Sequence, residues 1–156
     1  PGDGCGAGSA PDARTKYDYI LIDCPPALGM LTVNALVAAD SLLVPLQCEF
    51  FALEGLSQLL SIYERVRTSF NDVLQIQGVV LTMYDKRNNL SRQVAEDARN
   101  HLGAKVYDTV IPRNVRISEA PSFGRPVLLY DLQCAGALAY AHLASEMLKR
   151  EGVSLS

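Results

Sequence analysis

Apolar residues along this chain gather into short continuous runs, separated by longer segments in which they recur every three or four positions. The short runs are typical of strands buried on both faces of a parallel sheet, and the spaced segments predict helices with one buried side. Strands are expected over residues 19–22, 42–46, 73–82 and 106–111, and helices over residues 30–38, 53–69, 92–102 and 135–151. The alternation of strand and helix predicts a parallel, doubly wound α/β sheet with helices on both faces.

The two longest predicted helices each carry an apolar stripe, which marks the side expected to face the core. The stripe of the first helix consists of Leu56, Leu59, Leu60, Tyr63, Val66 and Phe70, and that of the last helix consists of Leu138, Ala141, Ala144 or Ser145, and Leu148. Ser91 is expected to cap the start of helix 92–102, and Gly103 is expected to end it.

The first 16 residues, PGDGCGAGSAPDARTK, differ in composition from the rest of the chain. Gly, Ala, Pro and Ser dominate this segment and no hydrophobic period appears, so we expect disordered or non-native sequence. One α/β domain is expected over residues 17–151, followed by a short tail over residues 152–156.

Composition narrows the class of protein without defining a function. The formal net charge is −3, which argues against a protein that coats nucleic acid by bulk charge but leaves room for a local basic patch. The four cysteines are scattered without a CxxC pair, which favours free thiols over a disulfide framework or a zinc site. No apolar run reaches the roughly 18 residues of a membrane span. We therefore expect a cytoplasmic protein.

Candidate chemistry begins at Asp23, which follows the apolar run 19–22 and precedes Pro25 and Pro26. An acid at the carboxyl end of a parallel strand lies at the edge where open α/β sheets bind ligands. Such an acid can hold Mg²⁺ through water or orient an attacking water. The two prolines would end the strand ladder and direct the chain over that edge. The alternative is that Asp23 only caps the helix that follows.

Two further polar segments follow the predicted strands 73–82 and 106–111. MYDKRNNL, over residues 83–90, is a basic loop, which is a natural binding element after a strand. IPRNVRISEAPS, over residues 111–122, is too polar for a strand and is expected to form a loop with one or two helical turns. Both segments are expected to leave the same edge of the sheet.

Three segments together carry a resemblance to a known family. They are ILIDCPPALG (residues 20–29), DKRNNL (residues 85–90) and IPRNVRISEAPSFGRPV (residues 111–127). The first resembles the Walker B and switch II segment of ParA/Soj-type chromosome-partitioning ATPases, which are deviant P-loop proteins related to the cell-division regulator MinD. The third is similar to the signature of that family over nearly all of its 17 residues. The order and separation of the three segments also agree with the family.

The resemblance implies that the intact protein binds ATP and Mg²⁺. It makes Asp23 the catalytic Walker B acid, which would hold Mg²⁺ through water. Switch II would include Pro25, Pro26 and Gly29, and the residues around the adenine ring would be Met83, Pro112, Arg113 and Asn114. In that site an Asn amide and backbone groups would read the edge of the base, while Pro and Met pack its face. The alternative for these four residues is an ordinary surface loop.

The resemblance also implies that arginines of the two later segments bind DNA without reading its sequence. These arginines are Arg87, Arg113 and Arg116, with Lys86 and Arg92 nearby. Contacts of Arg and Lys with phosphates need no base reading and weaken with salt. An intact relative would form a homodimer with nucleotide between the subunits, respond to a ParB-like partner protein and act at the nucleoid, not at a membrane. The alternative is a set of solvated surface arginines.

The chain departs from the family pattern because no GxxxxGK[ST] phosphate loop occurs in its 156 residues. The backbone N–H groups and the lysine of that loop would cradle the phosphates. We therefore expect the C-terminal part of such an ATPase, with N-terminal strands and the phosphate loop missing, and no ATPase activity for this chain alone. Two alternatives are a non-catalytic DNA- or partner-binding module and a MinD-like regulator. The few basic residues of the last helix argue against the second.

Overall fold

A computed structural model of the chain describes residues 16–25 and 29–153. Of the predicted N-terminal segment 1–16 only Lys16 is described, and of the predicted tail 152–156 only Gly152 and Val153 are described. Pro26 also lies outside the described residues. The centre of the fold is a sheet of parallel strands in the order β1-β2-β3. The strands are β1 (Ser41–Gln47), β2 (Gln75–Tyr84) and β3 (Val106–Pro112). Because they are parallel, all three end at one edge, which we call the carboxyl edge.

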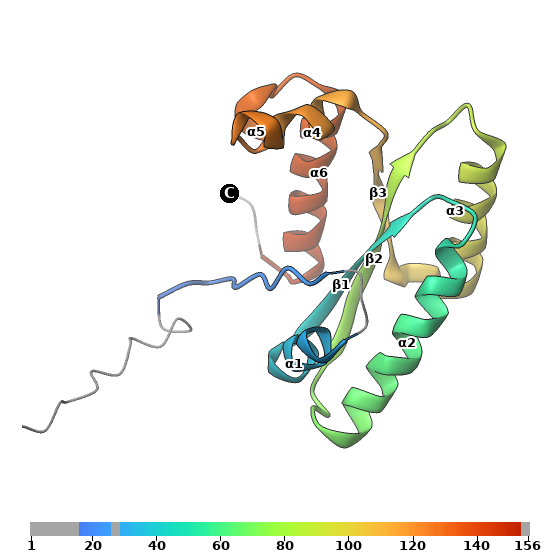
Figure 1. The fold of residues 1–156 in the computed structure, drawn as a ribbon, viewed down its shortest axis with the longest axis vertical. Helices are drawn as coiled ribbons and strands as arrows, with labels where there is room; N and C mark the ends of the chain where they lie inside the picture. The colour runs from blue at the N-terminus through green and yellow to red at the C-terminus, as the bar shows by residue number, and fades with distance from the viewer. Residues whose placement is uncertain (1–15, 26–28, 154–156) are drawn as a thin grey trace, which may run out of the picture.

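Helices cover both faces of the sheet, which confirms the predicted parallel α/β architecture (Figure 1). The helices are α1 (Met30–Ala38), α2 (Ala52–Ser69), α3 (Asn89–Leu102), α4 (Val115–Glu119), α5 (Val127–Tyr130) and α6 (Ala135–Arg150), with 3₁₀ turns η2 (Gly103–Lys105) and η3 (Ala120–Phe123). Helices α2 and α3 lie on one face, and α6 lies on the other. Helix α1 has the bounds that the sequence predicted.

The side chains of the central strand β2 alternate between two cores, which explains its continuous apolar run. Val79 and Leu81 face α2 and α3, whereas Val80 faces α6. The larger core consists of Val44, Leu46, Cys48, Leu56, Val79, Leu81, Val94, Ala95, Ala98 and Val106. The core under α6 consists of Val80, Tyr107, Ile111, Ala139 and Leu143. Tyr107 is fully buried there.

The start of helix α3 differs from the prediction, although its end does not. Asn88 caps the helix, because its side-chain oxygen accepts a hydrogen bond from the Leu90 N–H at 2.9 Å. Ser91 lies one turn inside the helix, is buried, and donates a hydrogen bond to the Cys48 carbonyl oxygen at 3.1 Å. Gly103 follows the last turn with a φ of 55°, a conformation that favours glycine.

The buried side of helix α6 is not the one that the sequence predicted. Its buried residues are Gly136, Ala137, Ala139 and Leu143, whereas Leu138 is 48% exposed. Small residues let this helix approach the sheet closely, so the side with the smaller side chains faces the core. The predicted stripe of α2 is correct except at its end, because Phe70 is 70% exposed. No helix within the described ranges is long and apolar enough to cross a membrane.

The predicted strand over residues 19–22 is absent from the structure. Tyr19, Ile20, Leu21 and Ile22 form no ladder with the sheet, and their exposed fractions run from 45% to 85%. An all-apolar strand is stable only when strands flank it and helices cover it. A hydrogen bond from the Tyr19 hydroxyl to Glu151, just after α6, instead ties this segment to the domain. The prediction of a buried strand here is therefore wrong.

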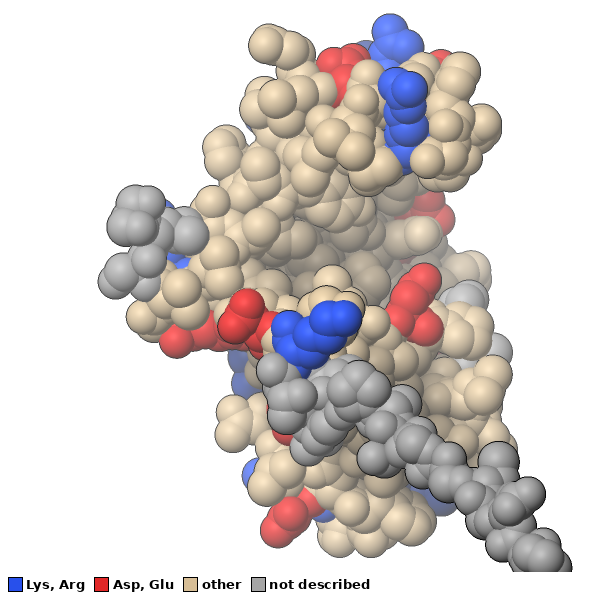
Figure 2. Space-filling model, turned by 90° about the vertical axis from the view of Figure 1, so that its left-hand side faces the viewer, with Lys and Arg blue, Asp and Glu red and all other residues tan. Residues whose placement is uncertain are grey.

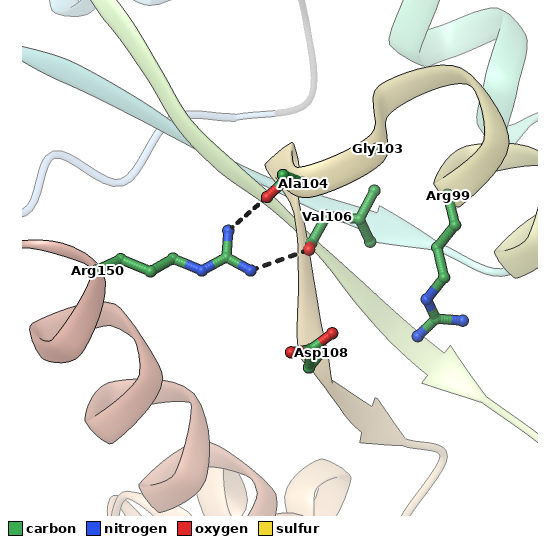
Figure 3. Close-up of a pocket in the computed structure, with 6 residues that line it drawn as sticks. All are labelled: Arg99, Gly103, Ala104, Val106, Asp108 and Arg150. Atoms are coloured by element: carbon green, nitrogen blue, oxygen red, sulfur yellow. Dashed lines mark hydrogen bonds between the residues drawn. The ribbon is translucent and has the colours of Figure 1, made fainter.

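Two side chains of α6, Glu146 and Arg150, close the outer edge of β3, and Figure 3 shows the two bonds that Arg150 makes there. The Glu146 carboxylate accepts hydrogen bonds from the backbone N–H groups of Asp108 and Thr109, each at 2.9 Å. Arg150 donates to the carbonyl oxygens of Ala104 and Val106, each at 3.0 Å, and also pairs with Glu146. An edge strand exposes unpaired backbone groups that can recruit another strand. The Glu146–Arg150 pair satisfies these groups and leaves an open hollow of about 650 Å³ beside them.

Replacing Glu146 with glutamine is expected to lower the free energy of unfolding by about 1 kcal/mol at neutral pH. Burial alone would raise the pKa of Glu146, but hydrogen bonds from Thr109, Asp108 and Arg150 outweigh it and lower the pKa. The charged form of Glu146 is therefore favoured in the folded state. Its contribution to the free energy of unfolding is present above the ordinary carboxyl pKa and is lost as the pH falls through the lowered pKa of the folded state.

Urea unfolding of the unmodified chain and of Glu146→Gln between pH 7 and pH 3 measures the contribution of the Glu146 charge to stability. Glu64→Gln, on the exposed side of α2, is the matched control and should show no pH-dependent difference. An equal loss of stability for Glu146→Gln at pH 7 and pH 3 would show that the charge of Glu146 does not stabilise the edge.

Candidate functional site

The loops that follow the three strands are tied together at the carboxyl edge. The Cys48 N–H, after β1, donates to the Thr82 carbonyl oxygen of β2 at 3.0 Å. The Arg113 N–H, after β3, donates to the Tyr84 carbonyl oxygen of β2 at 3.0 Å. These bonds extend the parallel ladders by one residue beyond the strands. They fix the starts of both basic segments next to each other, as the sequence predicted.

Met83, near the end of β2, and Pro112, at the end of β3, lie on neighbouring strands at the carboxyl edge. Pro112 is the last residue of β3 and is paired with Tyr84, the neighbour of Met83. Both side chains are half-buried. Met83 has a φ of 53°. Among the described residues it is the one non-glycine residue with a positive φ. Such a conformation is costly for a side-chain-bearing residue and is often found at functional sites.

Arg113 and Asn114 both have partners within the protein. The Arg113 guanidinium forms an ion pair with Glu49 through Nη2 and Oε1 at 3.1 Å, and both side chains are more than half exposed. The Asn114 side-chain oxygen accepts a hydrogen bond from the Arg116 N–H at 2.8 Å and caps α4. The oxygen of the Asn114 amide is therefore engaged in starting this helix.

Arg87 extends into solvent from the loop after β2. Its side chain is 93% exposed, and its Nε lies 3.4 Å from Oδ1 of Asp85. The same oxygen accepts the backbone N–H of Arg87 at 2.9 Å. Hydrogen bonds from the Arg87 backbone and side chain lower the pKa of Asp85. Asp85 thus fixes the turn of the loop and leaves most of the Arg87 guanidinium open to solvent.

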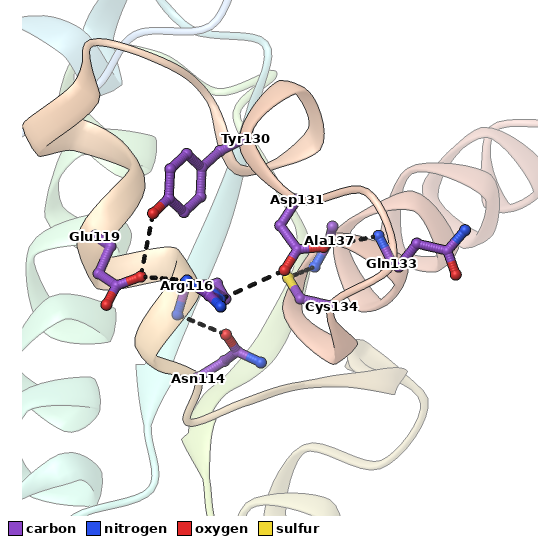
Figure 4. Close-up of polar contacts among 8 residues, drawn as sticks. All are labelled: Asn114, Arg116, Glu119, Tyr130, Asp131, Gln133, Cys134 and Ala137. Atoms are coloured by element: carbon purple, nitrogen blue, oxygen red, sulfur yellow. Dashed lines mark hydrogen bonds and ion pairs between the residues drawn. The ribbon is translucent and has the colours of Figure 1, made fainter.

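Arg116, in α4, is held by two carboxylates (Figure 4). Its Nη1 lies 3.0 Å from Oε2 of Glu119, and its Nε lies 3.5 Å from Oδ2 of Asp131. The Tyr130 hydroxyl donates to the same Glu119 oxygen at 3.3 Å. The hydrogen bond to Glu119 raises the pKa of Arg116. The Arg116 side chain is still 53% exposed to solvent.

The predicted Walker B and switch II residues do not join this group in the structure. Asp23 and Pro25 are exposed and follow no strand, and Pro26 lies outside the described residues. Gly29 stands at the start of α1, where its carbonyl oxygen accepts the Val33 N–H. The segment that contains Asp23 is tied through Tyr19 to Glu151, which also accepts a hydrogen bond from Gln77 near the amino end of β2.

The carboxylates of the described residues do not gather into a cluster that could hold a metal ion. Within these ranges, no group of three or more His, Cys, Asp or Glu side chains is placed to hold a metal. Mg²⁺ in nucleotide sites is held by one or two carboxylates together with phosphate oxygens and water. Asp23 can supply one such carboxylate, but this chain provides no phosphate loop to bring the phosphates beside it.

The charges near α4 and α5 are mixed, not uniformly basic. Figure 2 shows basic side chains beside acidic ones at this end of the molecule, above a hollowed and mostly uncharged face. We call residues 85–88 and 113–116 the arginine loops. The sequence predicted the arginines of these loops but not their acidic partners Glu49, Glu119 and Asp131. Only Glu119 was recognisable, because it stands three residues after Arg116 in a predicted helical turn.

Comparison with known proteins gives close relatives by sequence. The chain is 69% identical over 139 residues to the chromosome partitioning protein ParA of Caulobacter vibrioides, a match that covers 89% of this chain and 52% of the relative. It is 56% identical over 134 residues to the sporulation initiation inhibitor protein Soj of Bacillus subtilis, covering 86% of this chain and 53% of the relative. A family profile described as an AAA domain matches residues 10–76.

Two solved structures share the fold of this chain. Cobyrinic acid a,c-diamide synthase from Mycobacterium smegmatis, solved with bound ADP and magnesium, has a TM-score of 0.70 and 33% identity, covering 90% of this chain and 51% of that chain. The cell division ATPase MinD of Pyrococcus furiosus has a TM-score of 0.68 and 28% identity, covering 86% of this chain and 53% of that chain. The chain therefore belongs to the ParA/Soj family of chromosome-partitioning proteins, and it spans about half the length of the curated relatives it matches.

Proposed function

We propose that this chain is part of a chromosome- or plasmid-partitioning ATPase, and that its arginine loops bind DNA phosphates without reading the base sequence. The observation that carries the proposal is the 69% identity over 139 residues with a chromosome partitioning protein. The geometry supports it, because Arg87, Arg113 and Arg116 follow strands that end at one edge. We expect their guanidinium groups to approach one DNA backbone together.

The three arginines differ in how freely they can bind a phosphate. Arg87 is almost fully exposed, and its guanidinium has a long contact with Asp85. Arg113 and Arg116 must share their guanidinium groups between carboxylates of the protein and a phosphate. Because every phosphate contact releases counterions, the affinity should fall steeply with salt concentration. Arg87 should therefore contribute most to binding by this chain.

The nucleotide part of the proposal concerns the intact protein. Met83 and Pro112 lie at the ends of neighbouring strands at the carboxyl edge and Asn114 follows two residues later, and such an edge is where open α/β sheets bind ligands. They could hold the adenine ring of ATP, with Arg113 beside them. Phosphoryl transfer also needs positioned phosphates and neutralised charge. No GxxxxGK[ST] phosphate loop occurs in this chain, so we expect no ATP turnover by the chain alone.

Family membership supports the remaining parts of the proposal. An intact protein of this kind would form a homodimer with ATP and Mg²⁺ between its subunits. It would act at the nucleoid in the cytoplasm and respond to a ParB-like partner. Asp23 would then serve near Mg²⁺, and Pro25, Pro26 and Gly29 would belong to a switch segment that responds to nucleotide.

Replacing Arg87 with alanine is expected to weaken DNA binding about three- to tenfold and to reduce the slope of log affinity against log salt by about 1. The measurement is fluorescence anisotropy with two labelled duplexes of unrelated sequence. The unmodified chain should bind both duplexes equally.

Arg65→Ala, an exposed arginine near the far end of α2, is the control with the same change in net charge. The proposal is wrong if Arg87→Ala binds DNA as Arg65→Ala does, or if the two duplexes differ strongly in affinity.

A second candidate function is a non-catalytic DNA-binding module. The observation that favours it is the presence of both arginine loops in a chain without a GxxxxGK[ST] motif. Such a module would bind DNA to the same extent with and without ATP. A MinD-like regulator shares the fold at 28% identity, but the partitioning relatives are much closer in sequence.

A further inference from the structure

We infer that Asp131 competes with DNA phosphate for Arg116, while Glu119 holds the guanidinium in place. This inference rests on the proposed DNA binding and assigns a role to residues outside the predicted site. Both carboxylates contact the same guanidinium, but through different nitrogens and at different distances. The contact with Asp131 is the longer one at 3.5 Å, so it is the one that a phosphate can replace.

Glu119 is well placed to orient Arg116. The two residues are three positions apart on α4, and their contact at 3.0 Å is short. The Tyr130 hydroxyl donates to the same carboxylate oxygen, which fixes Glu119 against α5 (Figure 4). A hydrogen bond shared in this way limits the movement of the carboxylate. The Arg116–Glu119 contact should therefore persist when DNA binds.

Asp131 is held by its own turn independently of Arg116. Its Oδ1 accepts the Gln133 N–H at 3.2 Å, and its backbone carbonyl accepts the Cys134 N–H at 3.3 Å. The other oxygen, Oδ2, faces Arg116. Releasing Arg116 would cost Asp131 only one long ion pair, and its side chain is 32% exposed to water. Exposed ion pairs of this kind contribute little, so exchange for a phosphate is feasible.

The negative charge of Asp131 also opposes the approach of a phosphate. A DNA phosphate that approaches Arg116 must come close to Asp131, and two negative groups repel each other. Removing the charge of Asp131 should therefore strengthen DNA binding in two ways. It frees Nε of Arg116, and it removes the repulsion between Asp131 and the phosphate. Asparagine keeps an oxygen that can accept the Gln133 N–H, so the turn should persist in Asp131→Asn.

The test is a double-mutant cycle measured by DNA anisotropy in low salt. Asp131→Asn is expected to tighten binding about two- to fivefold, the range that an exposed ion pair contributes. In an Arg116→Ala background the same change should have much less effect, because the competition requires the guanidinium. Asp72→Asn is the charge-matched control, in the turn before β2 at the opposite end of the sheet.

Three results would overturn the inference while the proposed function stands. They are weaker binding by Asp131→Asn, an equal gain for Asp131→Asn in the Arg116→Ala background, and an equal gain for Asp72→Asn. Absence of salt-dependent DNA binding by the unmodified chain would overturn the proposed function and this inference together.

Discussion

Replacing Gly78 with alanine is expected to lower the free energy of unfolding by about 3 kcal/mol. Gly78 lies in the central strand β2, directly against the fully buried ring of Tyr107 on β3. A Cβ atom at Gly78 would lie 2.9 Å from the Lys105 carbonyl oxygen and closer still to the Tyr107 ring. Neither group can move cheaply, because one is backbone and the other fills the core under α6.

Arg150 adds to the cost of moving Tyr107. Its guanidinium lies over the Tyr107 ring, 4.0 Å from the ring centroid, and at the same time bonds to the edge of β3. A displaced ring would therefore disturb the closure of that edge as well as the core. Thermal unfolding followed by circular dichroism measures the effect.

Gly55→Ala is the matched control for Gly78→Ala. Gly55 lies in α2, and a Cβ atom there would meet no atom within 4 Å. Alanine in an exposed helix position should stabilise the protein by about 0.5–1 kcal/mol. If Gly78→Ala and Gly55→Ala shift the unfolding midpoint in the same direction, the described packing of β2 against Tyr107 is incorrect.

Replacing Gly136 with valine should have the second largest effect, and it should also displace the arginine loop over residues 113–116. Gly136 is buried in the first turn of α6, against α4. A Cβ atom there would lie 2.6 Å from Cγ1 of Ile117 and 3.4 Å from Cβ of Asn114. A branched side chain would push α4 outward, with an expected loss of about 1–3 kcal/mol in unfolding free energy.

The displacement of α4 should also change the affinity for DNA. Asn114 caps α4 and Arg116 lies on it, so both should lose their places when the helix moves. We expect Gly136→Val to weaken DNA binding about as much as Arg116→Ala does, measured by anisotropy at a temperature where the variant is folded. Ala135→Val, one position earlier on the exposed side, is the control. Unchanged DNA affinity in folded Gly136→Val would contradict a role for α4 in binding.

Local patterns were sufficient to predict most elements of the fold. The apolar run around Val79 and Leu81 predicted a strand, because both its faces are buried beneath helices. The stripe through Leu56, Tyr63 and Val66 predicted the buried side of α2. Both signals depend only on spacing along the chain. The same is true of the placement of Met83 and Pro112, since parallel strands must end at one edge.

Features that depend on contacts across the chain could not be predicted in this way. The buried side of α6 contains Gly136 and Ala139, which carry little hydrophobic signal but allow close packing on the sheet. Residues 19–22 have the composition of a buried strand, but composition does not supply neighbours. The ion pairs of Arg113 with Glu49 and of Arg116 with Asp131 join residues 64 and 15 positions apart, so no local pattern marks them.

The central claim is that this chain can serve as half of a partitioning ATPase. The most direct measurement is ATP hydrolysis by a hybrid in which the matched 139 residues replace their counterpart in Caulobacter vibrioides ParA. We predict turnover close to that of the unmodified ParA and stimulated by DNA, and loss of turnover when the hybrid carries Asp23→Asn. A hybrid that folds and dimerises but hydrolyses no ATP would contradict the claim.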